Sequence, residues 1–149
     1  MKLVIRRYLP ADQNRLIEIL KFSTPEFFHP REKADFVQYL SKYLEDYFVI
    51  ESDAVVVGCG GINYLPLYGE ARISWDIVHP EFRSKGIGST LLKHRLNEIK
   101  GGKIPVSKVV VRSSQKAFHF YQKFGFTLVH SQKDYWAPGF DLFELEMAI

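Results

Sequence analysis

Residues 83–88 place two basic side chains and two glycines directly before a predicted helix. They read Arg-Ser-Lys-Gly-Ile-Gly and follow a predicted strand. The first turn of a helix leaves backbone N–H groups unpaired and carries a partial positive charge, so phosphate oxygens bind there. Gly86 and Gly88 let the backbone approach an anion closely. Arg83 and Lys85 add positive charge, so the segment predicts a phosphate-binding loop.

Two better-known phosphate loops do not fit these residues. The Walker loop needs Gly-Lys-Ser/Thr, whereas here Ser89 follows Gly88 with no lysine between them. The dinucleotide fingerprint needs a third glycine where this chain has Leu91. An ATP-dependent enzyme that uses the loop is therefore the weaker alternative.

The elements around the loop follow from hydrophobic periodicity and turn residues. Strands are expected at 3–8, 47–51, 54–62, 71–78, 108–112, 127–134 and 140–147. Helices are expected at 10–22, 31–45, 86–100 and 114–124. This order, with hairpins at both ends, predicts a mixed sheet covered by helices. The 149 residues suit one domain, which we expect to span 1–149.

A second informative block, residues 114–126, reads Ser-Gln-Lys-Ala-Phe-His-Phe-Tyr-Gln-Lys-Phe-Gly-Phe. In this block a helix that carries Ala117 and Tyr121 is followed by Gly125-Phe126 at the start of the next strand. Together with Arg83-x-x-Gly86-x-Gly88, it resembles the two signatures of the GCN5-related N-acetyltransferase (GNAT) superfamily, and the resemblance covers essentially the whole chain. It implies the acyl-CoA N-acyltransferase fold, an α/β (α+β) fold with a mixed, mostly antiparallel central sheet flanked by helices.

The resemblance implies that acetyl-CoA is the acetyl donor and that transfer to a primary amine is direct, without a covalent enzyme intermediate or a metal. Backbone groups of Ile77 and Val78 would pair with the pantetheine arm like an added strand. Ser114 stands where the family usually has Asn, which puts that one contact in doubt. The residues that the resemblance assigns to the cofactor are Ile77, Val78, Arg83, Ser84, Lys85, Gly86, Ile87, Gly88, Ser89, Ser114, Ala117 and Tyr121.

Tyr121 matches the general acid of the family. The tetrahedral intermediate expels a thiolate, and a phenol with a pKa of about 10 can protonate a thiolate of similar basicity. Without the resemblance, Tyr121 would be interpreted as a core aromatic on the same helix as Phe118 and Phe124.

The general base stays open at this point, because strand 71–78 offers more than one candidate. Side chains alternate along a strand. One face is expected to carry Glu70, Arg72, Ser74 and Asp76, and the other Ile73, Trp75 and Ile77. Asp76 is the leading candidate, with Glu70 and a water chain as rivals. Arg72 occupies the position that is most often acidic in the family, so this chain departs from the pattern there.

Composition limits the remaining classes of partner. The net charge of +3 is too small to indicate nucleic-acid binding, and no run of 18 apolar residues predicts a membrane span. Cys59 is the one cysteine, so no internal disulfide is expected. We expect a cytoplasmic protein, and a homodimer is compatible with the sequence.

The acceptor should be bound by the loop 23–30, the helix 31–45 and the hairpin tip at 135–140. Aromatic residues concentrate in these segments, and they indicate a pocket for a small-molecule amine: Phe27, Phe28, Trp136 and Phe140. A protein N-terminus or lysine is the alternative acceptor. A catalytically inactive acyl-CoA sensor is the alternative to an enzyme.

Overall fold

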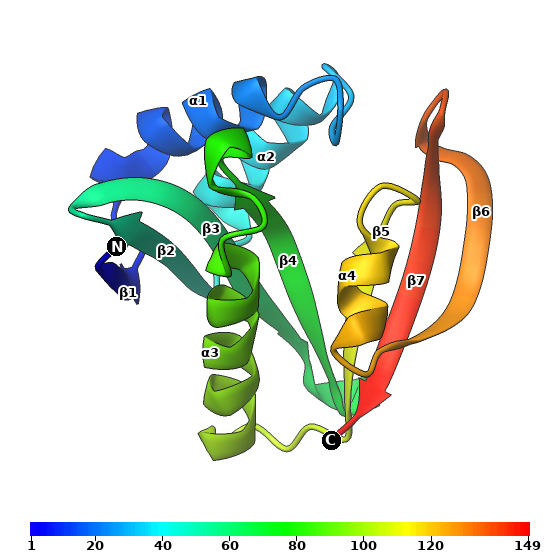
Figure 1. Cartoon of the computed structure of the whole chain (residues 1–149). Helices are drawn as coiled ribbons and strands as arrows, with labels where there is room; N and C mark the ends of the chain where they lie inside the picture. Colours follow the sequence, from blue (N-terminus) through cyan, green and yellow to red (C-terminus); the bar gives the residue numbers. More distant parts are fainter.

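The computed structural model describes all residues 1–149, which form a seven-stranded sheet with helices on both faces (Figure 1). The strands are β1 (Leu3–Arg7), β2 (Asp46–Ser52), β3 (Val55–Leu65), β4 (Glu70–Val78), β5 (Lys108–Ser113), β6 (Thr127–Ala137) and β7 (Phe140–Ala148). The helices are α1 (Gln13–Phe22), α2 (Glu32–Lys42), α3 (Ile87–Gly101) and α4 (Phe118–Lys123).

The strand order is β1-β2-β3-β4-β5-β7-β6. Every neighbouring pair is antiparallel except β4 and β5, which are parallel. The mixed, mostly antiparallel sheet predicted from the sequence is therefore confirmed. A parallel pair needs a long crossover connection, and here α3 supplies it.

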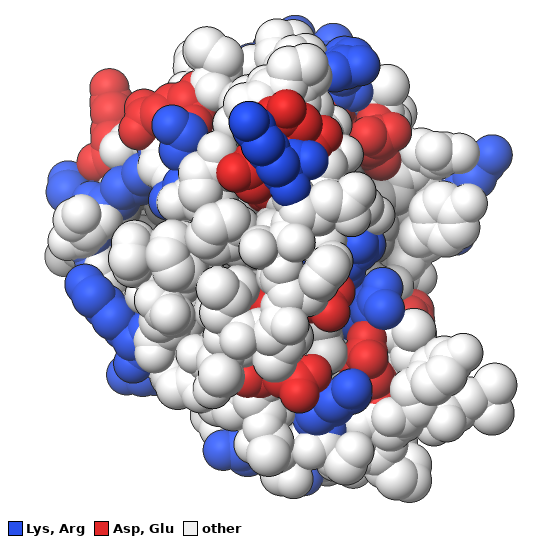
Figure 2. Space-filling view, turned by 90° about the vertical axis from the view of Figure 1, so that its right-hand side faces the viewer, with Lys and Arg blue, Asp and Glu red and all other residues white.

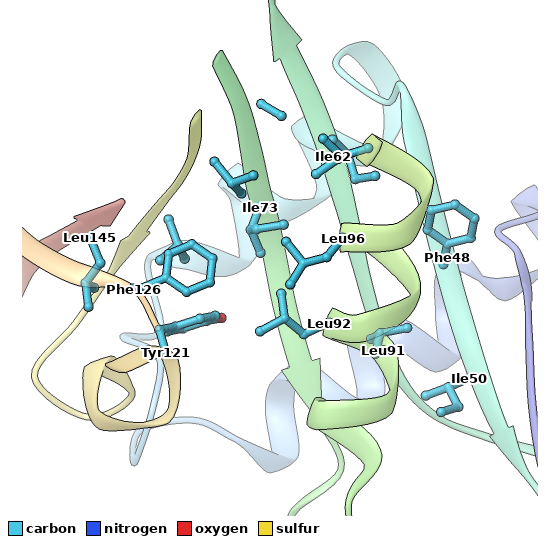
Figure 3. Packing of buried hydrophobic residues seen from close by; sticks show 14 of the residues in the cluster. Phe48, Ile50, Ile62, Ile73, Leu91, Leu92, Leu96, Tyr121, Phe126 and Leu145 are labelled. Atoms are coloured by element: carbon cyan, nitrogen blue, oxygen red, sulfur yellow. The ribbon is translucent and has the colours of Figure 1, made fainter. Parts of the chain in front are cut away.

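The sheet separates two apolar layers. On one face Leu91, Leu92 and Leu96 of α3 point at the strands, as Figure 3 shows, and Tyr121 of α4 packs into the same cluster. On the other face α1 and α2 cover the sheet, with Phe36 of α2 fully buried. Because both faces are covered, the central strands are apolar on both sides.

The parallel strands β4 and β5 separate along their length. Their pairing ends at Ile73 and Val111, while β4 continues to Val78 and β5 to Ser113. Figure 1 shows the two strands close together at one end and spread apart at the other. Backbone groups of β4 beyond Ile73 therefore have no partner on β5.

A β-bulge interrupts β4 within this separated part. Gly61 pairs with Ser74 and Cys59 with Ile77, so Gly60 alone opposes two residues of β4. Trp75, the first of these two, has a φ of 48°. A bulge inserts one extra residue and reverses the alternation of side chains beyond it.

The bulge overturns one prediction about β4. We expected Asp76 to share a face with Ser74, but it lies on the α3 and α4 face, where its partners are Arg95 and Tyr121. Trp75 instead packs against Phe36 on the α2 face. The prediction was wrong because it assumed unbroken alternation.

Two glycines of β3 are explained by close contacts. A Cβ on Gly60 would lie within the contact distance of the Asp76 carboxylate and 2.7 Å from Arg95 Nη1, and a Cβ on Gly61 would meet the Tyr47 ring. Glycine at these two positions therefore allows the backbone of β3 to lie close to neighbouring side chains.

Two predicted helices are shorter in the structure. The helix expected at 114–124 begins only at Phe118, because residues 114–117 form a turn in which Ala117 has a φ of −125°. The helix expected at 31–45 ends at Lys42. No helix of the structure has the length and apolarity needed to cross a membrane.

Candidate active site

A cavity of about 860 Å³ opens where β4 and β5 separate. It brings together nearly all the residues assigned to the cofactor from the sequence: Ile77, Val78, Arg83, Ser84, Gly86, Ile87, Gly88, Ser89, Ser114, Ala117 and Tyr121. Asp76 lines it as well, whereas Lys85 does not. The Lys85 ammonium instead lies 5.2 Å from the centre of the Phe82 ring.

The N-terminus of α3 faces this cavity. Gly86 precedes the helix with a φ of 82°, a left-handed conformation that side chains rarely adopt, and a Cβ there would meet open space. The Gly86 carbonyl accepts hydrogen bonds from the backbone and hydroxyl of Thr90. The first-turn N–H groups of α3 are therefore fixed in direction and available to an anion.

The Arg83 side chain is held by residues of the loop after α1. Its Nη2 donates to Ser23 Oγ at 3.0 Å, and its guanidinium lies 3.6 Å from the centre of the Phe27 ring. Burial lowers the pKa of Arg83 from its ordinary value. Arg83 thus connects the loop after α1 to the predicted phosphate loop.

Tyr121 and Asp76 meet deep in the cavity. The Tyr121 hydroxyl donates to Asp76 Oδ2 at 2.5 Å, although 45 positions separate the residues in sequence. Tyr121 is 5% exposed. Burial and, next, the negative charge of Asp76 raise the pKa of Tyr121 well above its ordinary value of 10, so the phenol stays protonated at neutral pH.

Arg95 supports the same carboxylate from α3. Its Nη2 forms an ion pair with Asp76 Oδ1 at 2.5 Å. Arg95 also donates to the carbonyls of Leu91 and Gly61, and it is 1% exposed. Isolated buried charges are costly, so this pairing explains how Arg95 is tolerated there.

Sequence reasoning missed Arg95, although a signal was present. Arg95 lies four residues after Leu91 and four before Ile99, inside the apolar stripe of α3. A charged residue at such a position predicts a buried partner on the facing strand.

The opposite side of the cavity is aromatic, as predicted. Phe27, Phe28, Trp136 and Phe140 all line it. The His29 and Phe140 rings meet edge to face at 5.7 Å, so the loop before α2 touches the β6–β7 hairpin. These segments enclose a pocket on the α2 face of the sheet.

Carboxylates are few in this cavity. Besides Asp76, only Glu32 lines it, and burial raises the pKa of Glu32. Glu70, the other base candidate from the sequence, lies outside the cavity and pairs with Arg72 at 2.5 Å. Of the two carboxylates predicted as the base, only Asp76 therefore lines the cavity, and the choice between Asp76 and a water chain stays a prediction.

The chain belongs to the family of the acetyltransferase (GNAT) domain, whose model matches residues 44–128. The matched segment begins just after α2 and runs from β2 through β3, β4, α3, β5 and α4 into β6. It therefore contains the phosphate loop, the bulge and both Asp76 and Tyr121.

Two curated relatives differ in their acceptors. An amino-acid acetyltransferase of Mannheimia succiniciproducens is 26% identical over 70% of this chain and 24% of its own length. An N-alpha-acetyltransferase of Sulfurisphaera tokodaii is 28% identical over 93% of this chain and 89% of its own. The chain spans about a quarter or less of the amino-acid acetyltransferases that it matches.

Solved structures share the whole fold. Ard1 from Thermoplasma volcanium has a TM-score of 0.82 at 22% identity, with 100% of this chain and 99% of Ard1 covered. An aminoglycoside 6′-N-acetyltransferase complexed with coenzyme A has a TM-score of 0.76 at 13% identity, with 97% and 96% covered. At these identities the likeness concerns the fold.

Proposed function

We propose that this chain transfers the acetyl group of acetyl-CoA directly to a primary amine of a small molecule. The observation that carries the proposal is the Tyr121–Asp76 hydrogen bond in the cavity that the α3 N-terminus also faces. An anion site and a proton-transfer pair in one cavity fit a phosphorylated donor whose reactive end must be protonated as it leaves.

In this proposal the separated strands hold the donor. The pyrophosphate lies on the backbone N–H groups from Arg83 to Ser89, and the pantetheine arm pairs with the free edge of β4 at Ile77 and Val78. Ser114 and Ala117 line the same cavity and would contact the arm. The thioester then reaches the level of Tyr121.

Tyr121 and Asp76 divide the proton transfers. The amine nitrogen attacks the thioester carbon, and Asp76 accepts the proton that the nitrogen loses. The carbon–sulfur bond then breaks, and the Tyr121 hydroxyl gives its proton to the departing thiolate. Because Tyr121 already donates to Asp76, the proton on Asp76 replaces the one that Tyr121 gave, and the pair returns to its starting state.

Direct transfer agrees with the state of the one cysteine. Cys59 is fully buried, and burial raises the pKa of its thiol to about 12. A thiol that stays protonated is a poor nucleophile, so an acetyl-cysteine intermediate is disfavoured.

The aromatic enclosure of the α2 face favours a small acceptor over a protein lysine. The contact between His29 and Phe140 joins the loop before α2 to the β6–β7 hairpin, and both segments contribute aromatic residues to the cavity. The single domain, the cytoplasmic location and a homodimer all stay predictions.

Two measurements test the proposal. Acetyl-CoA at a hundredfold excess over its Kd should raise the free energy of unfolding by about 2.7 kcal/mol, read as a higher melting temperature. A panel of amines should release free CoA thiol from acetyl-CoA. Binding without thiol release would indicate the acyl-CoA sensor, and stabilisation by ATP but not by acetyl-CoA would overturn the assignment of the loop.

A further inference from the structure

Two arginines on neighbouring strands line the acceptor side of the cavity. Arg72 lies on β4 and Arg112 on β5, and both contribute to the cavity wall. Asn63, which pairs with Arg72 across the sheet, hydrogen-bonds to Tyr39 of α2, so Arg72 shares the α2 face. Arg112 follows Val111, which packs on the α3 face, and therefore also points to the α2 face.

The register places these two side chains at the opening between the strands. Arg72 pairs with Val110 on β5, and Arg112 follows Val110 by two residues on the same strand. This spacing puts their Cα atoms about 8 Å apart, close enough for two guanidinium groups to contact one small anion. Arg112 is also the first residue of β5 after the last pair, Ile73 with Val111.

Each arginine keeps donors for a ligand. The Arg72 side chain uses Nε for Glu70 and makes no other hydrogen bond in the protein. Arg112 uses Nε for Glu144 and Nη2 for the Tyr135 hydroxyl, which leaves Nη1. The acidic partners Glu70 and Glu144 lie outside the cavity, whereas the arginines Arg72 and Arg112 line it.

The charged residues that line the cavity differ in their arrangement from those of the outer surface. Figure 2 shows Lys and Arg interspersed with Asp and Glu over the face that it displays. The cavity lining includes Arg72 and Arg112, and its carboxylates are Asp76, which pairs with Arg95, and Glu32, whose pKa is raised by burial. The planar guanidinium group of arginine can donate two parallel hydrogen bonds to a carboxylate.

We propose that Arg72 and Arg112 form a carboxylate subsite, and that the acceptor is a free amino acid whose amine reaches the thioester while its carboxylate binds the two guanidinium groups. This inference rests on the proposed acetyl transfer and names its substrate class. A peptide N-terminus has an amide where a free amino acid has its α-carboxylate, so the subsite selects against peptides.

The test compares each of the twenty L-amino acids with its own α-amide as acceptor, by thiol release from acetyl-CoA. The protein should acetylate at least one amino acid with a kcat/KM at least 10-fold above that of its amide. Arg72→Gln and Arg112→Gln should each raise the KM for that acid by about 10- to 100-fold and leave the amide unchanged, as expected for loss of a charge-assisted hydrogen bond. Retained activity on the amide shows that each variant is folded.

Arg7→Gln is the matched control, because Arg7 is an exposed arginine of the same sheet that pairs with Asp46 and does not line the cavity. This variant should change the KM for neither the amino acid nor its amide. Equal rates with acid and amide, a preference for the amide, or acetylation of other amines but of no amino acid would overturn the subsite while the acetyltransferase proposal stands. If no amine at all releases thiol, the proposed function fails first, and this inference fails with it.

Discussion

Arg95 Nη2 lies 2.5 Å from Asp76 Oδ1, so a buried guanidinium on α3 is paired with the carboxylate that accepts the Tyr121 hydrogen bond. The three side chains come from α3, β4 and α4, and they connect the core of one layer to the cavity. In the proposed mechanism, stability and catalysis share the same contacts at this site, and variants must separate the two.

Tyr121→Phe should lower kcat by about 10²-fold and change KM little, because it removes one hydroxyl and keeps the ring. The raised pKa of Tyr121 gives a second readout. The active form is the protonated phenol, so kcat of the parent at saturating acceptor should decline only at a pH above 10, the ordinary value for tyrosine.

In Tyr121→Phe that alkaline decline should be absent. Steady-state kinetics over the range from neutral to strongly alkaline pH, with circular dichroism to confirm folding at each pH, provides both measurements. A variant with parental kcat and the same alkaline decline would make Tyr121 a core aromatic and leave the acid to another group.

Asp76→Asn should reduce kcat by about 10²- to 10⁴-fold, because the amide cannot accept the proton of the amine. It should also lower the free energy of unfolding by about 3–5 kcal/mol, since Arg95 would be left buried without its partner. Chemical denaturation and kinetics on the same preparations would measure both effects.

The double variant Asp76→Asn with Arg95→Leu separates these two losses. It removes both charges, so much of the stability should return while kcat stays low. Recovery of kcat together with stability would mean that Asp76 has only a structural role.

Gly86→Val should weaken acetyl-CoA binding by at least 10-fold. Gly86 has a φ of 82°, which a β-branched residue adopts only under strain, and its Cβ would enter the open space before α3. The matched control is Gly101→Val, in the last turn of the same helix, where a Cβ also meets open space. Titration of both variants by calorimetry tests this prediction, and equal affinities would place the pyrophosphate elsewhere.

The sequence alone determined the parts of this protein that depend on short stretches of chain. The glycines and basic residues of 83–88, directly before a periodic apolar helix, predict an anion site because backbone N–H groups at a helix start are unpaired whatever the rest of the fold. The block around Tyr121 and the order of strands and helices were likewise local patterns, and they were sufficient to predict the fold.

Only the tertiary structure decided how the side chains of the site meet. One extra residue at Trp75 moves Asp76 to the face of Tyr121. The alternation of residue types along β4 does not predict this bulge. Asp76, Arg95 and Tyr121 lie on three different elements, so their contacts depend on how a strand and two helices pack. Such contacts join residues far apart in sequence, and their geometry is set by the register of β4 against β3, which no local pattern specifies.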